Sequence, residues 1–285
     1  MSSAASVTYP WPTSPDGKPI VIGHRGDLSD AAENTMGSFR LAAAHQAAMV
    51  ETDIQISADG VPFLLHDDTL TRTTNAAAVL GDQTEPVAET QTWADLSRLD
   101  AGSWLGADHA GERVPHLDDL AALHNEPRPG SPALGFDLEI KPPLTHPASH
   151  VIQVINTHLR SAAWSKAVAA EQVAVTSFDP EVVELAVATL PVPVGLLLAT
   201  APDPLDLPDL AGAGISAIVV EHSGLTEAVM VAASQAGLAV WVYTANERSD
   251  WDRLIALGVG GICTDHPGAL RSYLESMSAP ADSVE

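Results

Sequence analysis

The 285-residue sequence has little cysteine and little positive charge. Its one cysteine, Cys263, excludes an intramolecular disulfide and a zinc site built from several thiolates. Only 13 lysines and arginines stand against 37 aspartates and glutamates, which gives a net charge of -24 at neutral pH. Nucleic acids and anionic membranes are bound by basic patches, so neither is expected as a partner. An anionic substrate would need local positive charge from a few basic residues or a bound cation.

Long apolar segments are also missing. No run of 18 apolar residues occurs, and the first residues do not form a basic segment followed by an apolar one. We therefore expect no stable membrane association and a cytoplasmic location. Apolar residues make up 46% of the chain and charged residues 18%, which is the composition of a folded globular protein.

What the sequence does contain is an alternation of short apolar runs, rich in valine and isoleucine, with stretches of helical periodicity. Eight strand-helix units of this kind predict a closed (β/α)8 barrel, a TIM barrel, in one domain covering residues 1–285. The predicted strands are residues 20–24, 49–57, 134–141, 173–178, 194–199, 217–222, 239–246 and 261–266.

One long gap interrupts this alternation. Residues 67–132 lie between the second and third predicted strands and contain turn-forming residues, two tryptophans and the helical stretch LDDLAALH. The gap has too few strong strands to bury a core of its own. It therefore predicts an insertion into the barrel rather than a second domain.

Acidic residues occur on two of the predicted strands with a spacing of two. Glu51 and Asp53 leave the same face of one strand, and Glu139 and Lys141 repeat that spacing on the next. If they face the barrel lumen, three carboxylates converge, and such a group favours a hard divalent cation, Mg²⁺ or Ca²⁺. The alternative is a structural network in which these acids pair only with Arg25 and Lys141.

Two histidines are directed at the same acidic site. His24 ends the first predicted strand. The SADG turn at residues 57–60 predicts a hairpin that returns antiparallel and brings His66 beside residues 52 and 53. The other histidines show no such convergence and are interpreted as surface or packing residues, with His222 left undecided.

An ordered series of motifs carries a family resemblance along nearly the whole chain. The motifs are HRG at 24–26, ENT at 33–35, ETD at 51–53, HDDTLTRTT from His66, DLEIK at 137–141, SFD at 177–179, WVYTAN at 241–246 and GICTDHP at 261–267. This series resembles the glycerophosphodiester phosphodiesterases, a family of phosphatidylinositol-phospholipase-C-like TIM barrels. The resemblance implies metal-dependent hydrolysis of glycerophosphodiesters to sn-glycerol 3-phosphate and an alcohol, through a cyclic phosphate.

The resemblance also implies a role for each matching residue. The metal ligands would be Glu51, Asp53 and Glu139. The general acid and base would be His24 and His66, and phosphate oxygens would be held by Arg25 and Lys141. Support of the first loop would come from Glu33 and Asn34, with Asn34 also a possible metal or phosphate contact, and the alcohol pocket would be lined by Phe178 and Trp241.

Two departures from the family pattern leave the choice of alcohol open. Gly260 stands where the family usually has an acidic residue, and WVYTAN replaces the common WTVN, with Tyr243 inserted before Thr244. Two other functions compete with glycerophosphodiester hydrolysis. A lysophospholipase-D-like enzyme would need an apolar mouth for acylated lipids, and a non-catalytic anion-binding barrel would lack a histidine or a metal ligand. The preferred head group, the metal and the oligomeric state are not determined by the sequence.

Overall fold

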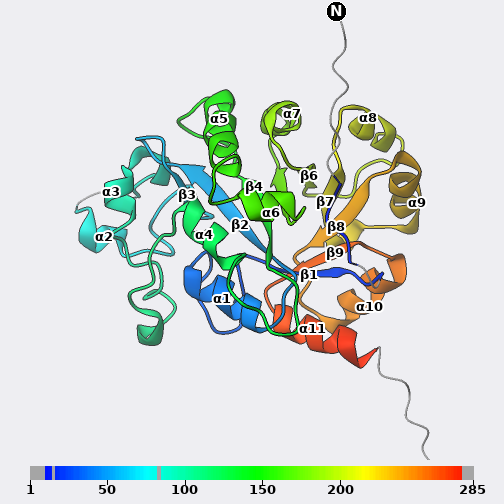
Figure 1. The fold of residues 1–285 in the computed structure, drawn as a ribbon, viewed down its shortest axis with the longest axis horizontal. Coiled ribbons are helices and arrows are strands. Elements are labelled where there is room, and N and C mark those ends of the chain that lie inside the picture. The colour runs from blue at the N-terminus through cyan, green and yellow to red at the C-terminus, as the bar shows by residue number, and fades with distance from the viewer. Residues whose placement is uncertain (1–9, 15–16, 82–84, 278–285) are drawn as a thin grey trace, which may run out of the picture.

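The structure, a computed structural model, describes residues 10–14, 17–81 and 85–277. Eight parallel strands form a closed barrel, because β1 pairs with both β2 and β9 (Figure 1). The predicted TIM barrel is confirmed. The barrel strands are β1 (Ile20–Gly23), β2 (Met49–Ile56), β4 (Gly135–Ile140), β5 (Val173–Ser177), β6 (Val194–Leu198), β7 (Ala217–Glu221), β8 (Ala239–Tyr243) and β9 (Gly261–Thr264).

Helices connect the strands and cover the outside of the barrel. Their apolar faces and the outer faces of the strands form the main core, which includes Phe39, Leu138, Ile155 and Trp164. The helices are α1 (Met36–Ala44), α5 (Ala148–Leu159), α6 (Ser165–Ala169), α7 (Pro180–Thr189), α8 (Leu207–Gly212), α9 (Glu227–Ala236), α10 (Arg248–Leu257) and α11 (Pro267–Ser276), with the short 3-10 turn η3 (His222–Gly224).

The remaining strand, β3 (Pro62–Leu64), is the return arm of the predicted hairpin. It pairs antiparallel with β2, with Ile54 opposite Leu64. The amide N–H of Leu65 donates to the carbonyl of Asp53 at 3.0 Å, so the next residue, His66, arrives beside the end of β2. The hairpin expected from the SADG turn is therefore confirmed.

The long segment between β3 and β4 lies beside the barrel, with α2 and α3 at the far left of Figure 1. Part of it, with Phe63 of β3, forms a separate apolar cluster that includes Leu70, Leu96 and Leu99. Its last helix, α4, packs on α1 and β3. The elements are α2 (Ala76–Val79), η1 (Ala88–Thr90), α3 (Trp93–Leu96), η2 (Ala107–His109) and α4 (Leu117–Leu123).

Two tryptophans fill the barrel lumen. The rings of Trp11 and Trp241 meet edge to face with centroids 4.7 Å apart, and both are buried. A Cβ on Gly195 would lie 2.8 Å from Trp11, and one on Gly261 would lie 2.7 Å from Trp241. These glycines leave room for the two rings, which belong to the lumen core together with Ile22, Met49 and Cys263.

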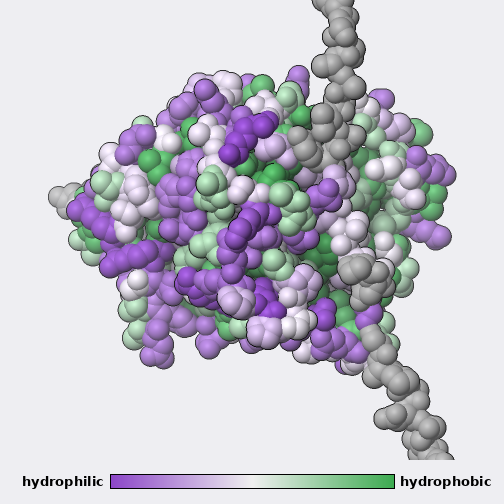
Figure 2. Space-filling model, viewed as in Figure 1, coloured by the Kyte–Doolittle hydropathy of each residue, from purple (hydrophilic) through white to green (hydrophobic). Residues whose placement is uncertain are grey.

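Hydrophilic and hydrophobic residues are mixed across the face of the molecule seen in Figure 2. Within the described part of the chain, each helix is too short or too polar to cross a bilayer. Large apolar side chains are exposed at Trp104, Leu105, Leu144, Leu205, Val231 and Met277.

Candidate active site

A cavity of about 200 Å³ opens where the barrel strands end. In a TIM barrel the side chains at the carboxyl ends of all eight strands converge at this edge, and the residues of the active site are found there. Most of the predicted site residues line it: His24, Arg25, Glu51, His66, Glu139, Lys141 and Phe178. Asp137, Tyr243 and Cys263 line it as well, and none of these three was given a site role from the sequence.

The carboxylates converge because β2 and β4 are adjacent and in register. Glu51 lies opposite Asp137, and Asp53 lies opposite Glu139. One carboxylate oxygen from each of Glu51, Asp53 and Glu139 lies within 4.8 Å of the other two, and all three side chains are buried. The structure therefore places the three predicted metal ligands together.

This cluster carries more negative charge than its basic neighbours balance. Burial raises the pKa of Glu51 well above its usual value, and the nearby Asp53 and Glu139 raise it further. Burial also raises the pKa of Asp137 to about 7. Asp53 behaves differently: burial raises its pKa, but Lys141 and Arg25 outweigh that effect and the net shift is downward.

The residues fit a hard divalent cation. Glu51 Oε1 is buried and has no hydrogen-bond partner among the described residues, and Asp53 Oδ1, also buried, has only an ion pair with Lys141 at 3.3 Å. Buried acceptors of this kind are costly unless a donor or a cation reaches them. A divalent cation bound by Glu51, Asp53 and Glu139 would supply both the missing partner of Glu51 Oε1 and the missing positive charge.

The two predicted phosphate-binding cations lie at the same cluster. Lys141 Nζ is 2.8 Å from Glu139 Oε1 and 3.3 Å from Asp53 Oδ1. Arg25 Nε is 3.4 Å from Asp53 Oδ2. The backbone of Arg25 has φ of 54°, a left-handed conformation that is uncommon for a side chain of this size. In this conformation the backbone N–H of Arg25 donates to Glu51 Oε2 at 2.9 Å.

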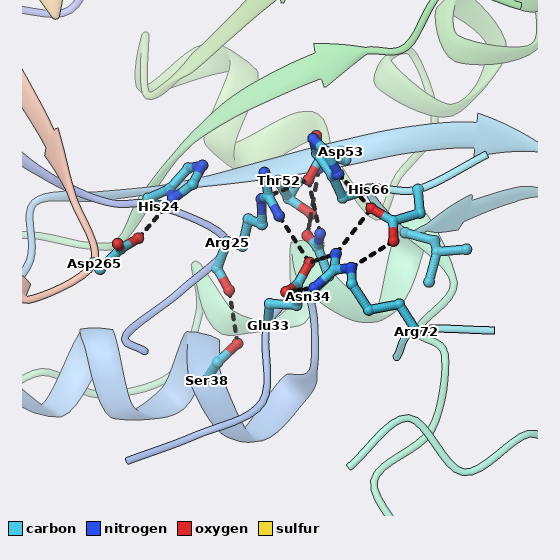
Figure 3. Close-up of polar contacts among 12 residues, drawn as sticks. His24, Arg25, Glu33, Asn34, Ser38, Thr52, Asp53, His66, Arg72 and Asp265 are labelled. Atoms are coloured by element: carbon cyan, nitrogen blue, oxygen red, sulfur yellow. Dashed lines mark hydrogen bonds and ion pairs between the residues drawn. The ribbon is translucent and has the colours of Figure 1, made fainter. Parts of the chain in front are cut away.

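Glu33 and Asn34 hold the loop that follows β1 (Figure 3). Glu33 accepts from Arg25 Nη1 at 2.8 Å. Asn34, also left-handed with φ of 52°, donates from Nδ2 to Asp53 Oδ2 at 2.8 Å and accepts from the hydroxyl of Thr52. Glu33 therefore contacts Arg25, which lines the cavity, and Asn34 contacts Asp53 of the carboxylate cluster; neither Glu33 nor Asn34 lines the cavity itself.

His24 has one ring nitrogen fixed by a carboxylate. Its Nδ1 is 2.7 Å from Asp265 Oδ1, and Asn246 donates to the other oxygen of Asp265 at 2.6 Å. Burial raises the pKa of Asp265, but the bonds from His24 and Asn246 lower it more. An ionised Asp265 selects the tautomer of His24 with the proton on Nδ1, which leaves Nε2 to accept a proton.

His66 has the same arrangement on the opposite loop. Its Nδ1 is 2.7 Å from Asp67 Oδ1, and Arg72 donates to both oxygens of Asp67. Arg72 also donates to both oxygens of Glu33, so one guanidinium joins the loop of His66 to the loop of Arg25 (Figure 3). Burial lowers the pKa of His66, and the nearby charge of Asp53 offsets part of this shift.

The aromatic wall of the cavity differs from the prediction. Phe178 and Tyr243 meet edge to face with ring centroids 5.9 Å apart, and both line the cavity. Trp241 does not line it, because strand periodicity places it two residues deeper in β8, where it is fully buried against Trp11. The expected place of Trp241 on the wall of this cavity is therefore not observed, and Tyr243 lines the cavity instead.

Three charged residues of the site were missed by the sequence reasoning, although each had a local signal. Asp67 directly follows His66, and Arg72 stands in the same HDDTLTRTT motif. Asp265 directly follows β9, the last barrel strand, which must lie beside β1, and hence close to His24, if the barrel closes. The undecided His222 lies away from the cavity and accepts from Arg253 at 3.2 Å.

Comparison with known proteins agrees with this geometry. The profile of the Glycerophosphoryl diester phosphodiesterase family matches residues 24–269. YhdW of Bacillus subtilis, whose name assigns it provisionally to the glycerophosphodiester phosphodiesterases, is 28% identical over 251 residues, covering 87% of this chain and 94% of YhdW. Mouse glycerophosphoinositol inositolphosphodiesterase GDPD2 is 37% identical over 142 residues, which is 45% of this chain and only 26% of GDPD2.

Solved structures show the same fold. An Oleispira antarctica phosphodiesterase in complex with the product sn-glycerol-3-phosphate superposes with a TM-score of 0.78 and 26% identity, covering 91% of this chain and 98% of that one. With the family profile spanning most of the sequence, this chain belongs to the glycerophosphoryl diester phosphodiesterase family.

Proposed function

We propose that the protein hydrolyses glycerophosphodiesters to sn-glycerol 3-phosphate and an alcohol, with a divalent cation and two histidines. The observation that carries this proposal is the meeting of three kinds of group in one cavity. These are a buried carboxylate cluster, two basic side chains and two histidines that each have Nδ1 held by a carboxylate. The sn-glycerol 3-phosphate found in the Oleispira antarctica structure supports this choice of product.

The ligands of the cation would be Glu51, Asp53 and Glu139, and Mg²⁺ and Ca²⁺ are the candidates because every donor is a carboxylate oxygen. When bound, the cation supplies positive charge that polarises the phosphate. Arg25 and Lys141 hold non-bridging oxygens and stabilise the charge that grows on them in the transition state. Glu33 and Asn34 keep Arg25 and Asp53 in position.

Proton transfer belongs to His24 and His66. Hydrolysis of a phosphodiester requires one group to remove a proton from the attacking hydroxyl and another to protonate the leaving oxygen. In the proposed sequence, the neighbouring hydroxyl of the glycerol attacks phosphorus, the alcohol leaves, and water then opens the cyclic phosphate. Asp265 and Asp67 keep Nε2 of each histidine free for this exchange.

The apolar edge of the cavity is where the alcohol group would lie. Phe178 and Tyr243 form this edge, and the Tyr243 hydroxyl donates to the carbonyl of Leu198 at 3.0 Å, which fixes its ring. A cavity of about 200 Å³ suits a small head group better than an acylated one. Cytoplasmic location, a single domain and the absence of stable membrane association stay predictions.

A substrate panel tests this proposal. Glycerophosphocholine, glycerophosphoethanolamine, glycerophosphoinositol and lysophosphatidylcholine would be incubated with purified protein, and the phosphorus products identified by ³¹P NMR. We expect sn-glycerol 3-phosphate from at least one of the three water-soluble diesters. Preference for lysophosphatidylcholine would favour the lysophospholipase-D-like alternative. No turnover of any diester would leave only the anion-binding barrel.

A further inference from the structure

A second group of metal-ligating side chains lies outside the cavity. His116 immediately precedes α4, Asp118 is in its first turn, and His158 is near the end of α5. One ligand atom from each residue lies within 4.8 Å of the other two, and all three side chains are half-buried. No local pattern in the sequence indicates this convergence, because 39 residues, including strand β4, lie between Asp118 and His158.

The present contacts show how the group is held. The His158 ring is 2.9 Å from Asp118 Oδ1 through Nδ1, and the Trp164 indole donates to the same oxygen at 3.0 Å. The amide N–H of Asp118 donates to His116 Nδ1 at 2.9 Å. Among the described residues, no hydrogen bond is made by Nε2 of either histidine or by the second oxygen of Asp118.

The chemistry of these donors differs from that of the catalytic cluster. Two imidazoles and one carboxylate suit Zn²⁺ and other first-row transition metals, whereas Mg²⁺ and Ca²⁺ prefer oxygen ligands. A neutral imidazole and an ionised carboxylate are the forms that bind a metal.

We propose that His116, Asp118 and His158 bind one transition-metal ion, with Zn²⁺ as the expected occupant. The ion takes one ring nitrogen from each histidine and one carboxylate oxygen from Asp118. The bound ion thereby links α4 to α5. One water molecule would complete the four-coordinate arrangement that Zn²⁺ prefers.

The site has a route to the catalytic loop through the backbone. Pro115, the neighbour of His116, accepts from the Leu64 N–H at 3.0 Å, and His116 itself forms a bridge with Phe63. Phe63 and Leu64 belong to β3, the strand that leads directly to His66. Metal binding at His116 therefore stabilises the edge from which His66 reaches the cavity.

The test uses Co²⁺ and Zn²⁺ as probes on the full chain, first stripped of metal and then kept in excess Mg²⁺ to occupy the carboxylate cluster. Visible absorption of bound Co²⁺ reports nitrogen ligation, elemental analysis counts the bound ions, and thermal unfolding with Zn²⁺ reports stabilisation.

Two variants remove one ligand each while keeping the local hydrogen bonding. His116→Asn retains a side chain that can cap α4, and His158→Gln retains a donor for Asp118. The matched control is His150→Gln, from another close histidine pair with ring centroids 5.1 Å apart.

We expect one Co²⁺ per chain with nitrogen ligation and a Zn²⁺-dependent rise in the unfolding temperature. His116→Asn and His158→Gln should each weaken the affinity for Co²⁺ and for Zn²⁺ at least about tenfold, whereas His150→Gln should leave both affinities unchanged. Equal Co²⁺ affinity in the wild type and both variants, or no nitrogen-ligated Co²⁺ in the wild type, would overturn the proposal. None of these readouts uses turnover, so the result is independent of the proposed hydrolysis.

Discussion

Asp265 offers a sharp test of how the site prepares His24, through the single substitution Asp265→Asn. Asn246 is fixed in orientation, because its Oδ1 accepts from the Asp265 N–H and the Thr264 hydroxyl. Its Nδ2 must therefore donate, as it now does to Asp265 Oδ2 at 2.6 Å. An asparagine at position 265 would turn its carbonyl oxygen to Asn246 and its NH₂ group to His24.

The consequence is a change of tautomer. His24 Nδ1 would have to accept from the new NH₂ group, so the ring proton would move to Nε2, the nitrogen left for substrate. A neutral ring in that form cannot take a proton at Nε2, and an imidazolium with protons on both nitrogens would face the NH₂ group instead of a carboxylate. Both proton-transfer roles suffer, and we expect kcat to fall by about 10² to 10⁴-fold, which corresponds to about 3 to 5 kcal/mol in the activation barrier.

The assay is the initial rate of sn-glycerol 3-phosphate release over a range of substrate concentrations, with thermal unfolding as the control for folding. KM should stay within a few-fold, because Asp265 is not assigned to substrate binding. The substitution keeps the size of the side chain, so the unfolding temperature should change little. A folded Asp265→Asn protein whose kcat stays within about threefold of the wild type would refute the orienting role of Asp265.

Four other substitutions test separate parts of the account. His24→Gln and His66→Gln should each lower kcat about 10²-fold or more, while metal binding stays near normal. The variant that lacks the general acid should regain activity on a p-nitrophenyl ester. Rescue of both variants or of neither would contradict a division of roles. Arg72→Gln should lower the unfolding temperature at neutral pH. Glu33 and Asp67 have depressed pKa values in the folded state, that of Asp67 lowered to about 2, so the stability they contribute is present above their unfolded values near 4.5 and 3.8. The gap between wild type and variant should therefore close as the pH falls from about 5 toward 2, and a gap independent of pH would argue against the network. Trp241→Ala should destabilise the fold by about 3 to 5 kcal/mol in chemical denaturation, because the ring is fully buried, whereas Trp104→Ala, 40% exposed, should have little effect.

The sequence was sufficient for the barrel because local signals and global closure agree. Alternating strand and helix patterns gave eight units, and the spacing of two on β2 and β4 correctly brought Glu51, Asp53 and Glu139 to one face. The SADG turn likewise predicted how His66 returns beside Asp53. Each of these inferences depended on periodicity within a strand or on one short turn.

The failures involve depth and contacts between distant segments. Trp241 and Tyr243 leave the same face of β8, so periodicity cannot tell which one reaches the cavity and which one is buried below it. Arg72 joins two loops, and His116 and His158 meet through packing of α4 near α5, which no local pattern encodes. Such contacts are set by the packed structure rather than by sequence spacing.

The central claim is that this cavity cleaves glycerophosphodiesters with the help of a divalent cation at Glu51, Asp53 and Glu139. The most direct measurement is the rate of sn-glycerol 3-phosphate release from the best substrate of the panel. The rate is measured before chelation, after exhaustive chelation, and after Mg²⁺ or Ca²⁺ is returned. Elemental analysis checks the metal content of the chelated protein. The account predicts turnover that is abolished by chelation and restored by one of the two ions, and a Glu51→Gln protein that is not restored. Undiminished release of sn-glycerol 3-phosphate by protein shown to hold no metal would contradict it.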